Sequence, residues 1–297
     1  MNRTPLPIDP VLPEVVAALR RGPSVVVRAP PGAGKTTRVP PALLDAGVTG
    51  PGRILVLEPR RVAARAAARR MVVERGGRVG DEVGYQVRFD RQYGPHTRIL
   101  VVTPGVLLRL LHDDPYLESA GTVVFDEFHE RGLESDLALG MVRLVQQTVR
   151  PELRVVVMSA TLAAGPVAEY LGGCPVVAGE GRQYPVEIVY EPRPEYRPWP
   201  AAAAAAAERL LDRTDGDLLV FLPGLQEIRQ TARHLEGVAE ERGLAVLPLY
   251  GDLPAEQQDA ALAPMDRRKV VLATNVAETS VTVEGVAGVV KQTPVSY

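Results

Sequence analysis

The sequence predicts an α/β fold in two domains, with parallel β-sheets covered by helices. Three observations support this. Short runs rich in valine, leucine and isoleucine recur along the chain, alanine- and leucine-rich stretches separate them, and a proline-rich segment over 191–200 interrupts the alternation. Near-continuous apolar strands separated by helices are typical of parallel sheets that are buried on both faces. The length of 297 residues is sufficient for two cores of moderate size.

The first two thirds of the chain contain five apolar runs that we predict to be buried strands. Each run is short and consists mainly of β-branched or aliphatic residues. The five runs are 24–28, 53–57, 99–102, 122–125 and 154–158. The stretches 62–75 and 133–149 lie between them and have helical periodicity, so we predict helices there.

The proline-rich segment marks the predicted domain boundary. Residues 191–200 contain four prolines, and proline interrupts both helices and central strands, so we predict neither within this segment. We therefore expect a first domain over 1–180 and a second over 181–297. In the second domain the alternation resumes, with predicted strands at 218–222, 245–249 and 269–273, and predicted helices from Ala201 and over 225–235 and 254–261.

Composition excludes several classes of protein. The single cysteine, Cys174, excludes an intramolecular disulfide. No apolar stretch is long enough to cross a bilayer, and residues 1–11 lack the apolar core of a signal peptide, so we expect a cytoplasmic location without membrane contact. The net charge of −2 and the pI near 6.2 give no global support to nucleic-acid binding, which requires a local basic patch.

A glycine-rich segment follows the first predicted strand. Residues 29–37 read APPGAGKTT and contain the Gly34-Lys35-Thr36 end of a Walker A pattern. In such a loop the backbone N–H groups bind phosphate oxygens, Lys35 reaches the β- and γ-phosphates, and the Thr36 hydroxyl ligates Mg²⁺. Ala29 replaces the first glycine of the strict pattern, which is tolerable if its φ is negative. The alternative interpretation is a glycine-rich turn after a strand.

Two acidic residues, Asp126 and Glu127, end the apolar run over 123–125. This is a Walker B pattern, in which Asp126 holds the Mg²⁺ shell and Glu127 orients and deprotonates the attacking water. Alone, two acids after a strand are more often a solvated strand end. Here they follow Lys35 of the P-loop by 91 residues, and the joint occurrence predicts nucleotide hydrolysis. We expect the Walker B strand to run beside the P-loop strand.

The run over 126–131, DEFHER, resembles the DEAH-box helicases of superfamily 2, and its phenylalanine in third place is similar to the bacterial HrpB branch of that family. Further segments agree with the family in their order along the chain. They are motif Ia at 58–64, the GYQVRF sequence at 84–89, motif Ib at 103–107, motif III at 159–161, motif IV at 221–224 and motif V at 273–280. The N-terminal sequence is similar to the HrpB branch as well, and the resemblance extends to about Val290.

The resemblance implies two RecA-like P-loop NTPase domains with parallel sheets, with ATP between them and single-stranded RNA or DNA across their tops. The implied cofactors are ATP and Mg²⁺. The implied catalytic residues are Lys35, Asp126, Glu127 and His129, and Thr36 and Asp126 hold the metal. Gly32, Ala33, Gly34, Lys35, Thr36 and Thr37 bind the phosphates, and Arg70 stacks on the base. Arg60, Arg61, Thr103, Gly105 and Thr274 contact the nucleic-acid backbone. Ser159 and Thr161, together with His129, link the nucleotide state to domain closure.

The arginines of motif Ia also have a plainer interpretation. Arg61, Arg65 and Arg69 recur every four residues on one helical face, and such a stripe is usually solvated. Arg60 differs, because it follows a strand at the edge where ligands of parallel sheets gather.

The other motifs are also compatible with structural roles when each is taken alone. His129 would be a packed or capping histidine, and residues 159–161 an ordinary turn after a strand. Thr274 or Asn275 would cap the start of a helix. Their order along the chain favours function.

The family pattern continues beyond motif V to an arginine-rich motif VI, and residues 291–297 do not resemble that continuation. We therefore expect an incomplete second domain and impaired turnover, because an arginine supplied across a domain interface contributes about 10³–10⁵ in rate in related enzymes. The leading hypothesis is an ATP-dependent RNA helicase or translocase core. The alternatives are a nucleotide- and RNA-binding module with little turnover, and a P-loop kinase or signalling NTPase, against which the later helicase motifs argue.

Overall fold

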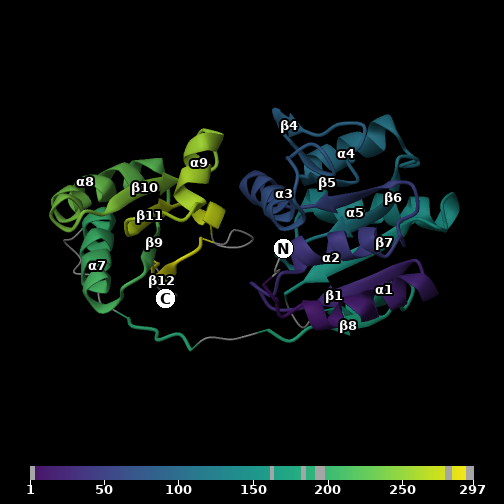
Figure 1. The fold of residues 1–297 in the computed structure, drawn as a ribbon, viewed down its shortest axis with the longest axis horizontal. Coiled ribbons are helices and arrows are strands. Elements are labelled where there is room, and N and C mark those ends of the chain that lie inside the picture. Colours follow the sequence, from purple (N-terminus) through teal and green to yellow (C-terminus); the bar gives the residue numbers. More distant parts are fainter. Residues whose placement is uncertain (1–3, 161–163, 182–184, 191–197, 278–282, 292–297) are drawn as a thin grey trace. The chain divides into compact units, whose positions relative to one another are not determined.

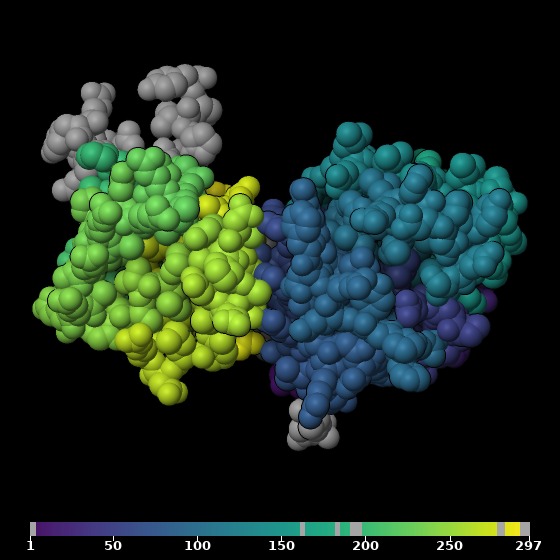
Figure 2. Space-filling model, turned by 90° about the horizontal axis from the view of Figure 1, so that it is seen from above, coloured from purple at the N-terminus to yellow at the C-terminus, as the bar shows by residue number. Residues whose placement is uncertain are grey.

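The computed structural model describes residues 4–160, 164–181, 185–190, 198–277 and 283–291. The chain divides into two compact units, Met1–Tyr184 and Pro185–Tyr297. Each unit contains a largely parallel sheet with helices, so the predicted α/β class is confirmed (Figure 1). Figure 2 shows the surface, with the first unit in purple to teal and the second in green to yellow. Among the helices of the described residues, none has the length and apolar character that a membrane span requires.

The sheet of the first unit has eight strands in the order β4-β3-β5-β2-β6-β7-β1-β8, and all neighbours are parallel except β3 and β4. The strands are β1 (Ser24–Arg28), β2 (Arg53–Leu57), β3 (Val83–Val87), β4 (Asp90–Gln92), β5 (Ile99–Val102), β6 (Ala120–Phe125), β7 (Arg154–Ser159) and β8 (Val176–Ala178). The five predicted strands are all present. Strands β4 and β8, which form the two edges of the sheet, and β3, which pairs with β4, were not predicted from the sequence.

The prediction that the Walker B strand runs beside the P-loop strand is wrong. Strand β6 pairs with β2 and β7, and β7 separates it from β1. Strands β1, β6 and β7 are all apolar and buried, so their sequence patterns do not distinguish their places in the sheet. Helical crossover connections allow a strand to pair with one that is not its neighbour in the sequence. Because the strands are parallel, the carboxyl ends of β6 and β1 still lie at the same edge of the sheet.

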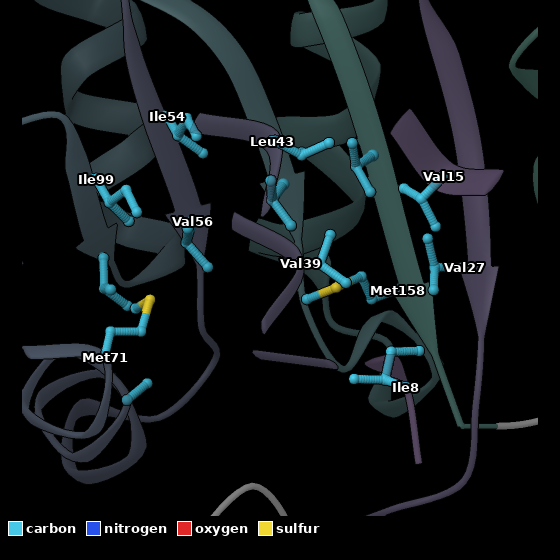
Figure 3. Close-up of a cluster of buried hydrophobic side chains, with 14 of the residues drawn as sticks. Ile8, Val15, Val27, Val39, Leu43, Ile54, Val56, Met71, Ile99 and Met158 are labelled. Carbon is cyan, nitrogen blue, oxygen red and sulfur yellow. The ribbon is translucent and has the colours of Figure 1, made fainter. Parts of the chain in front are cut away.

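Helices cover both faces of this sheet. One face carries α1 (Leu12–Arg21), α2 (Lys35–Asp45) and α3 (Arg61–Arg75), and the other carries α4 (Pro104–Asp113), α5 (Leu133–Thr148) and α6 (Ala164–Tyr170). Successive residues of a strand point to opposite faces, so Val27 of β1 joins the first core and Val26 joins the second. Figure 3 shows the first core, where Val39 and Leu43 of α2 lie among strand residues and Met71 of α3.

The second unit has a four-stranded parallel sheet in the order β10-β11-β9-β12. Its elements are α7 (Trp199–Arg213), β9 (Asp217–Phe221), α8 (Leu225–Arg242), β10 (Ala245–Leu249), α9 (Ala255–Leu262), β11 (Lys269–Ala273) and β12 (Val286–Val290). The predicted strands and helices are present, but α8 continues to Arg242, well beyond its predicted end at residue 235, and β12 was not predicted.

The start of α7 corrects one prediction. The helix begins at Trp199, so Trp199 and Pro200 are helical, although we predicted no helix within 191–200. Proline is compatible with the first turn, because the N–H that it lacks there has no partner within the helix. Residues 191–197 of the same segment lie outside the described residues.

Candidate active site

Most of the site residues predicted in the first unit gather at the carboxyl ends of five adjacent parallel strands, whereas Arg70 lies further along α3. Thr103 follows β5, Arg60 follows β2, and Asp126 with Glu127 follows β6. Ser159 ends β7, and the glycine-rich loop follows β1. This edge is where parallel sheets bind ligands. The two Walker B acids therefore lie between the predicted phosphate site and the predicted nucleic-acid contacts.

The glycine-rich loop joins β1 to α2 and has the backbone that phosphate binding requires. Gly32 and Gly34 have φ values of 73° and 93°, which favour glycine. Ala29 has no positive φ, so alanine is tolerated there. Gly34 precedes α2, and the N–H groups of Lys35 and Thr36 therefore lie at the positive end of an 11-residue helix.

Lys35 is held across this loop. Its side chain is buried, and Nζ donates to the carbonyl oxygens of Ala29 at 2.7 Å and Pro30 at 3.2 Å. A buried ammonium needs such acceptors. Phosphate oxygens are stronger, charged acceptors for the same donors.

Asp126 is buried at the end of β6. Burial, followed by the neighbouring Glu127 carboxylate, raises the pKa of Asp126 to about 7, against the opposing effects of the Thr36 hydroxyl and the Lys35 ammonium. One carboxylate oxygen, Oδ1, accepts the Glu127 N–H at 2.8 Å. The other, Oδ2, is buried and has no hydrogen-bond partner within the described part of the chain.

These groups fit a magnesium ion. Mg²⁺ prefers oxygen ligands and is usually held by one or two protein side chains together with phosphates. The unpaired Oδ2 of Asp126 and the Thr36 hydroxyl supply such oxygens beside the loop. No group of three or more His, Cys, Asp or Glu residues in the described ranges could hold a metal by itself.

The raised pKa of Asp126 gives a testable stability profile. The pKa of about 7 in the folded chain lies above the ordinary value of 3.8. Between these two pH values, the Asp126 carboxyl is therefore protonated in the folded chain and ionised in the unfolded chain. The stabilisation is present at low pH and is lost as pH rises towards 7, by at most about 1.4 kcal/mol per pH unit for one proton. We expect Asp126→Asn to flatten this decline. Urea unfolding of both nucleotide-free proteins between about pH 5 and 8 measures it, and identical profiles would contradict a buried, protonated Asp126.

Glu127 has a strained backbone. Its φ and ψ are 45° and 35°, in the left-handed region that is uncommon for residues other than glycine. Burial raises its pKa, with a further rise from Glu130, while Lys35 and Arg60 act in the opposite direction. The turn closes through a hydrogen bond of 2.9 Å from the Glu130 N–H to the Glu127 carbonyl. Strain of this kind occurs where the surroundings fix a functional side chain.

Phe128 anchors this turn. It is buried, and its ring packs edge-on against Phe125 with 6.1 Å between the ring centroids. The Arg131 guanidinium lies 5.4 Å from the centroid of the same ring. Burying a phenylalanine contributes about 1.5–3 kcal/mol, which helps to hold Glu127 in its strained conformation.

His129 contacts the loop after β7. Its Nδ1 accepts the Ala160 N–H at 3.3 Å and lies 3.2 Å from Oε2 of Glu127. Burial lowers its pKa, which favours the neutral imidazole, whose Nδ1 accepts a hydrogen bond. The structure thus brings His129 close to Glu127 and to the residue after Ser159. Thr161 lies outside the described residues, and the coupling role of all three remains a prediction.

Glu58 is a residue that sequence reasoning did not single out. It follows β2, is fully buried, and accepts the Arg60 N–H at 3.4 Å. Burial raises its pKa well above the ordinary value, and the charges of Asp126 and Glu127 add to this rise. An acid directly after a buried strand is the same signal that identified Asp126, and it was available at this position.

The predicted nucleic-acid contacts of the first unit differ in burial, and two of them lie close to a carboxylate. Arg60 precedes α3, is half-buried, and its Nη2 lies 3.3 Å from Oε2 of Glu130. Thr103 is buried before α4, and Gly105 is exposed close to the Glu134 carboxylate, which a Cβ at Gly105 would approach to 3.6 Å. Arg61 is half-buried at the start of α3.

Arg65 corrects the interpretation of a solvated arginine stripe. It is buried, and its Nη1 lies 3.4 Å from Oδ2 of Asp90. Arg70 lies five residues further along α3, and its side chain is 49% exposed.

The remaining predicted nucleic-acid contact, Thr274, belongs to the second unit. It follows β11, and its N–H donates to the Leu249 carbonyl at 3.1 Å.

Comparison with known proteins gives consistent matches. Residues 10–169 match the DEAD/DEAH box helicase family, and residues 202–295 match the helicase conserved C-terminal domain. The chain is 46% identical over 290 residues to the ATP-dependent RNA helicase HrpB of Escherichia coli (strain K12). It is 35% identical over 292 residues to the ATP-dependent RNA helicase HrpA of Borreliella burgdorferi. The crystal structure of the Escherichia coli DEAH/RHA helicase HrpB superposes with a TM-score of 0.86 at 44% identity, over 96% of this chain and 36% of that one.

The chain is shorter than these relatives. Each of the two sequence matches covers 96% of the chain but only 35% of the relative. The similarity therefore concerns one part of each relative, and that part includes the P-loop, the Walker B acids and the motifs of the second unit.

Proposed function

The chain belongs to the DEAD/DEAH box helicase family, and from this premise we propose that it binds and hydrolyses ATP with Mg²⁺ as the core of an RNA helicase or translocase. One observation carries the proposal. A glycine-rich loop at a helix N-terminus, a buried lysine and two buried acids meet at one edge of a parallel sheet. The names of the relatives, which describe ATP-dependent RNA helicases, support it.

The proposed chemistry assigns one task to each group. The N–H groups at the start of α2 bind the phosphates, and Lys35 moves its hydrogen bonds from Ala29 and Pro30 to phosphate oxygens. Thr36 and Asp126 hold Mg²⁺, which supplies charge neutralisation when bound. Glu127 orients a water molecule and accepts its proton.

The same site permits a second candidate, a nucleotide- and RNA-binding module with little turnover. Phosphate release by the 297-residue chain, with and without single-stranded RNA, separates the two. RNA-stimulated release supports the helicase or translocase core. ATP binding with no RNA-stimulated release supports the binding module. Absence of ATP binding would refute both.

The proposed nucleic-acid contacts are Arg60, Arg61, Thr103, Gly105 and Thr274. A motor that moves along a strand is expected to hold the backbone rather than read bases, so we propose single-stranded RNA of any sequence, or DNA, as the partner. A cytoplasmic location remains a prediction from the sequence.

We expect Arg60→Ala to weaken binding to single-stranded RNA and to lower its salt dependence. Each phosphate neutralised by the protein contributes about 0.7 to the slope of log affinity against log salt on single strands. Loss of one contact therefore lowers the slope by about 0.7. Titrations of labelled homopolymers at several salt concentrations measure this.

Arg131 provides a matched control. It is also an arginine of the first unit paired with a carboxylate, Asp136, at 2.7 Å, but it is well exposed. Arg131→Ala is expected to leave the slope unchanged. A strong preference of the unsubstituted chain for one homopolymer at all salt concentrations would contradict backbone recognition.

A further inference from the structure

The N-terminal segment, residues 4–11, contacts the glycine-rich loop directly. The Ile8 N–H donates to the Ala33 carbonyl at 3.0 Å. The Ile8 side chain is fully buried in the first core (Figure 3), to which Ala29 and Ala33 of the loop also belong. The segment and the loop therefore share a hydrogen bond as well as an apolar core.

The bond from Ile8 fixes the orientation of a single peptide unit. The Ala33 carbonyl and the Gly34 N–H belong to the same planar trans peptide, so they point in opposite directions. Because the Ala33 carbonyl is turned towards the N-terminal segment, the Gly34 N–H is turned away from it. Gly34 directly precedes Lys35 in the Walker A pattern, and its N–H is one of the donors that such a loop offers to phosphate oxygens.

Gly34 itself does not oppose rotation of this peptide. Its φ of 93° favours glycine, and glycine populates positive and negative φ about equally well. Rotation of the Ala33–Gly34 peptide by half a turn would carry this φ to a negative value, which glycine also accepts. The direction of the Gly34 N–H therefore depends on what surrounds the peptide, and the bond from Ile8 acts on its carbonyl.

Leu6 of the same segment covers Gly34. A Cβ built on Gly34 would lie 2.5 Å from Cδ1 of Leu6 and 3.2 Å from its Cβ. The leucine side chain thus occupies the space that a larger residue at position 34 would need. Two residues of the N-terminal segment, Leu6 and Ile8, therefore act on the same peptide unit of the loop.

Arg38 anchors the segment to the phosphate-binding helix. It lies three residues after Lys35, at the start of α2, and its side chain is only 2% exposed. Its Nη2 donates to the Thr4 carbonyl at 2.8 Å, and its Nε lies 3.8 Å from Oδ1 of Asp9 and 3.4 Å from Oε2 of Glu74. One guanidinium thus joins two points of the segment to α2 and α3.

Asp9 closes the turn that presents Ile8. Its Oδ2 accepts the Leu6 N–H at 2.8 Å, and its own N–H donates to the Leu6 carbonyl at 3.0 Å. The Asp9 side chain is 32% exposed, so a substitution there removes no core residue. Asp9 therefore links the conformation of the turn to the anchor on Arg38.

Stability alone is a weak reason for these polar contacts. The apolar burial of Ile8 needs no hydrogen bond to the loop, since the hydrophobic effect has no preferred direction. A buried ion pair such as Arg38 with Glu74, which is 8% exposed, often stabilises a protein no more than apolar side chains of similar size. Fixing a peptide matters more where its N–H serves as a donor, because hydrogen bonds weaken steeply when the donor is misdirected.

We propose that residues 4–9 are a positioning element of the phosphate site, in which Asp9 holds the turn and the Ile8 N–H keeps the Gly34 N–H available to the phosphates. This inference rests on the proposed function, because it requires that the loop binds the phosphates of ATP. The segment then affects the phosphates and not the nucleoside. Phosphate ligands in turn stabilise the docked segment, since coupling between two binding equilibria is reciprocal.

The first test compares two ligands that both carry phosphates. ADP and inorganic tripolyphosphate compete with a fluorescent nucleotide for the unsubstituted protein and for Asp9→Ala. We expect Asp9→Ala to weaken both ligands by the same factor, roughly three- to thirtyfold, below the full value of a hydrogen bond to a charged group because the burial of Ile8 is retained. A loss confined to ADP would assign the segment to the nucleoside, and unchanged affinity for both ligands would also overturn the inference.

Asp45→Ala is the matched control. Asp45 is a carboxylate at the other end of α2, where it lies 2.9 Å from Arg75 of α3. We expect its removal to leave both affinities unchanged. If Asp45→Ala weakens the two ligands as much as Asp9→Ala does, general loosening of the helix pair explains the effect and the inference is wrong.

Asp9→Asn tests the turn itself. It keeps a side-chain oxygen that accepts the Leu6 N–H and removes the charge that faces Arg38. We expect it to recover most of the affinity for both ligands that is lost in Asp9→Ala. Absence of any recovery would contradict the role of the turn.

Hydrogen exchange of the unsubstituted protein tests the reciprocal effect and needs no variant. Mass spectrometry follows amide exchange in the peptide that covers residues 4–11, with and without saturating tripolyphosphate. We expect the ligand to slow this exchange by at least about threefold. Unchanged exchange in the ligand-bound protein would overturn the inference, and this result decides if Asp9→Ala does not fold. If the unsubstituted protein binds neither ligand, the proposed function fails, which is distinct from unchanged exchange in a protein that binds.

Discussion

Lys35→Ala is expected to abolish measurable nucleotide binding. The ammonium is buried and has two main-chain carbonyls as acceptors within the loop, so its removal takes a positive charge away from the proposed site of the β- and γ-phosphates. A charged hydrogen-bonded contact contributes about 1.5–3 kcal/mol on its own, and the buried phosphates lose their neutralising charge as well. We therefore expect affinity for labelled ATP to fall by at least about a hundredfold.

Lys269 provides a control of the same type. It is also fully buried and donates to two main-chain carbonyls, those of Ala261 at 3.1 Å and Ala263 at 2.7 Å, but it lies at the start of β11 in the second unit. Lys269→Met is expected to change the thermal stability and to leave nucleotide affinity unchanged. Retention of ATP binding by Lys35→Ala would show that the glycine-rich loop is a turn without a phosphate role.

Glu127→Gln is expected to keep ATP binding and to remove hydrolysis. Glutamine has the shape of glutamate but does not accept a proton from water. A positioned general base contributes about 10²–10⁴ in rate, so phosphate release should fall by that factor. Labelled ATP binding and single-turnover phosphate release, measured on the same preparation, separate the two effects.

Asp136→Asn is the corresponding control, since Asp136 is a carboxylate of the same region that pairs with exposed Arg131. It is expected to release phosphate at the rate of the unsubstituted protein. Normal turnover by Glu127→Gln would remove Glu127 from the role of base and leave the strained conformation of its backbone without a catalytic explanation.

The sequence was sufficient for the fold class and for the strand, glycine-rich loop and helix of the predicted phosphate site, for a physical reason. Buried parallel strands require uninterrupted apolar runs, and a phosphate loop requires glycine at the positions with positive φ. Gly32 and Gly34 occupy such positions, with the predicted helix directly after them. These requirements leave a pattern in a single stretch of chain, where it is readable without any knowledge of tertiary contacts.

Features that depend on distant residues were not predictable in this way. The strand between β1 and β6 is specified by packing between elements, and all three strands have the same apolar pattern. The burial of Arg65 depends on Asp90, which lies on an edge strand that we did not predict. The bridge from Arg38 through Glu74 joins residues 36 positions apart, and neither has a motif that marks it.

The contact of residues 4–8 with the glycine-rich loop and the helix after it also has a practical consequence for protein engineering. Thr4 is exposed, yet its carbonyl accepts a hydrogen bond from Arg38, and Ile8 bonds to the loop itself. A purification tag fused directly before this segment is therefore attached close to residues that contact the glycine-rich loop, and we expect it to perturb measurements of nucleotide binding. A tag at the other terminus is attached to the second unit instead. Conversely, an environment-sensitive fluorophore placed at Thr4 is well positioned to serve as a sensor of ligand occupancy.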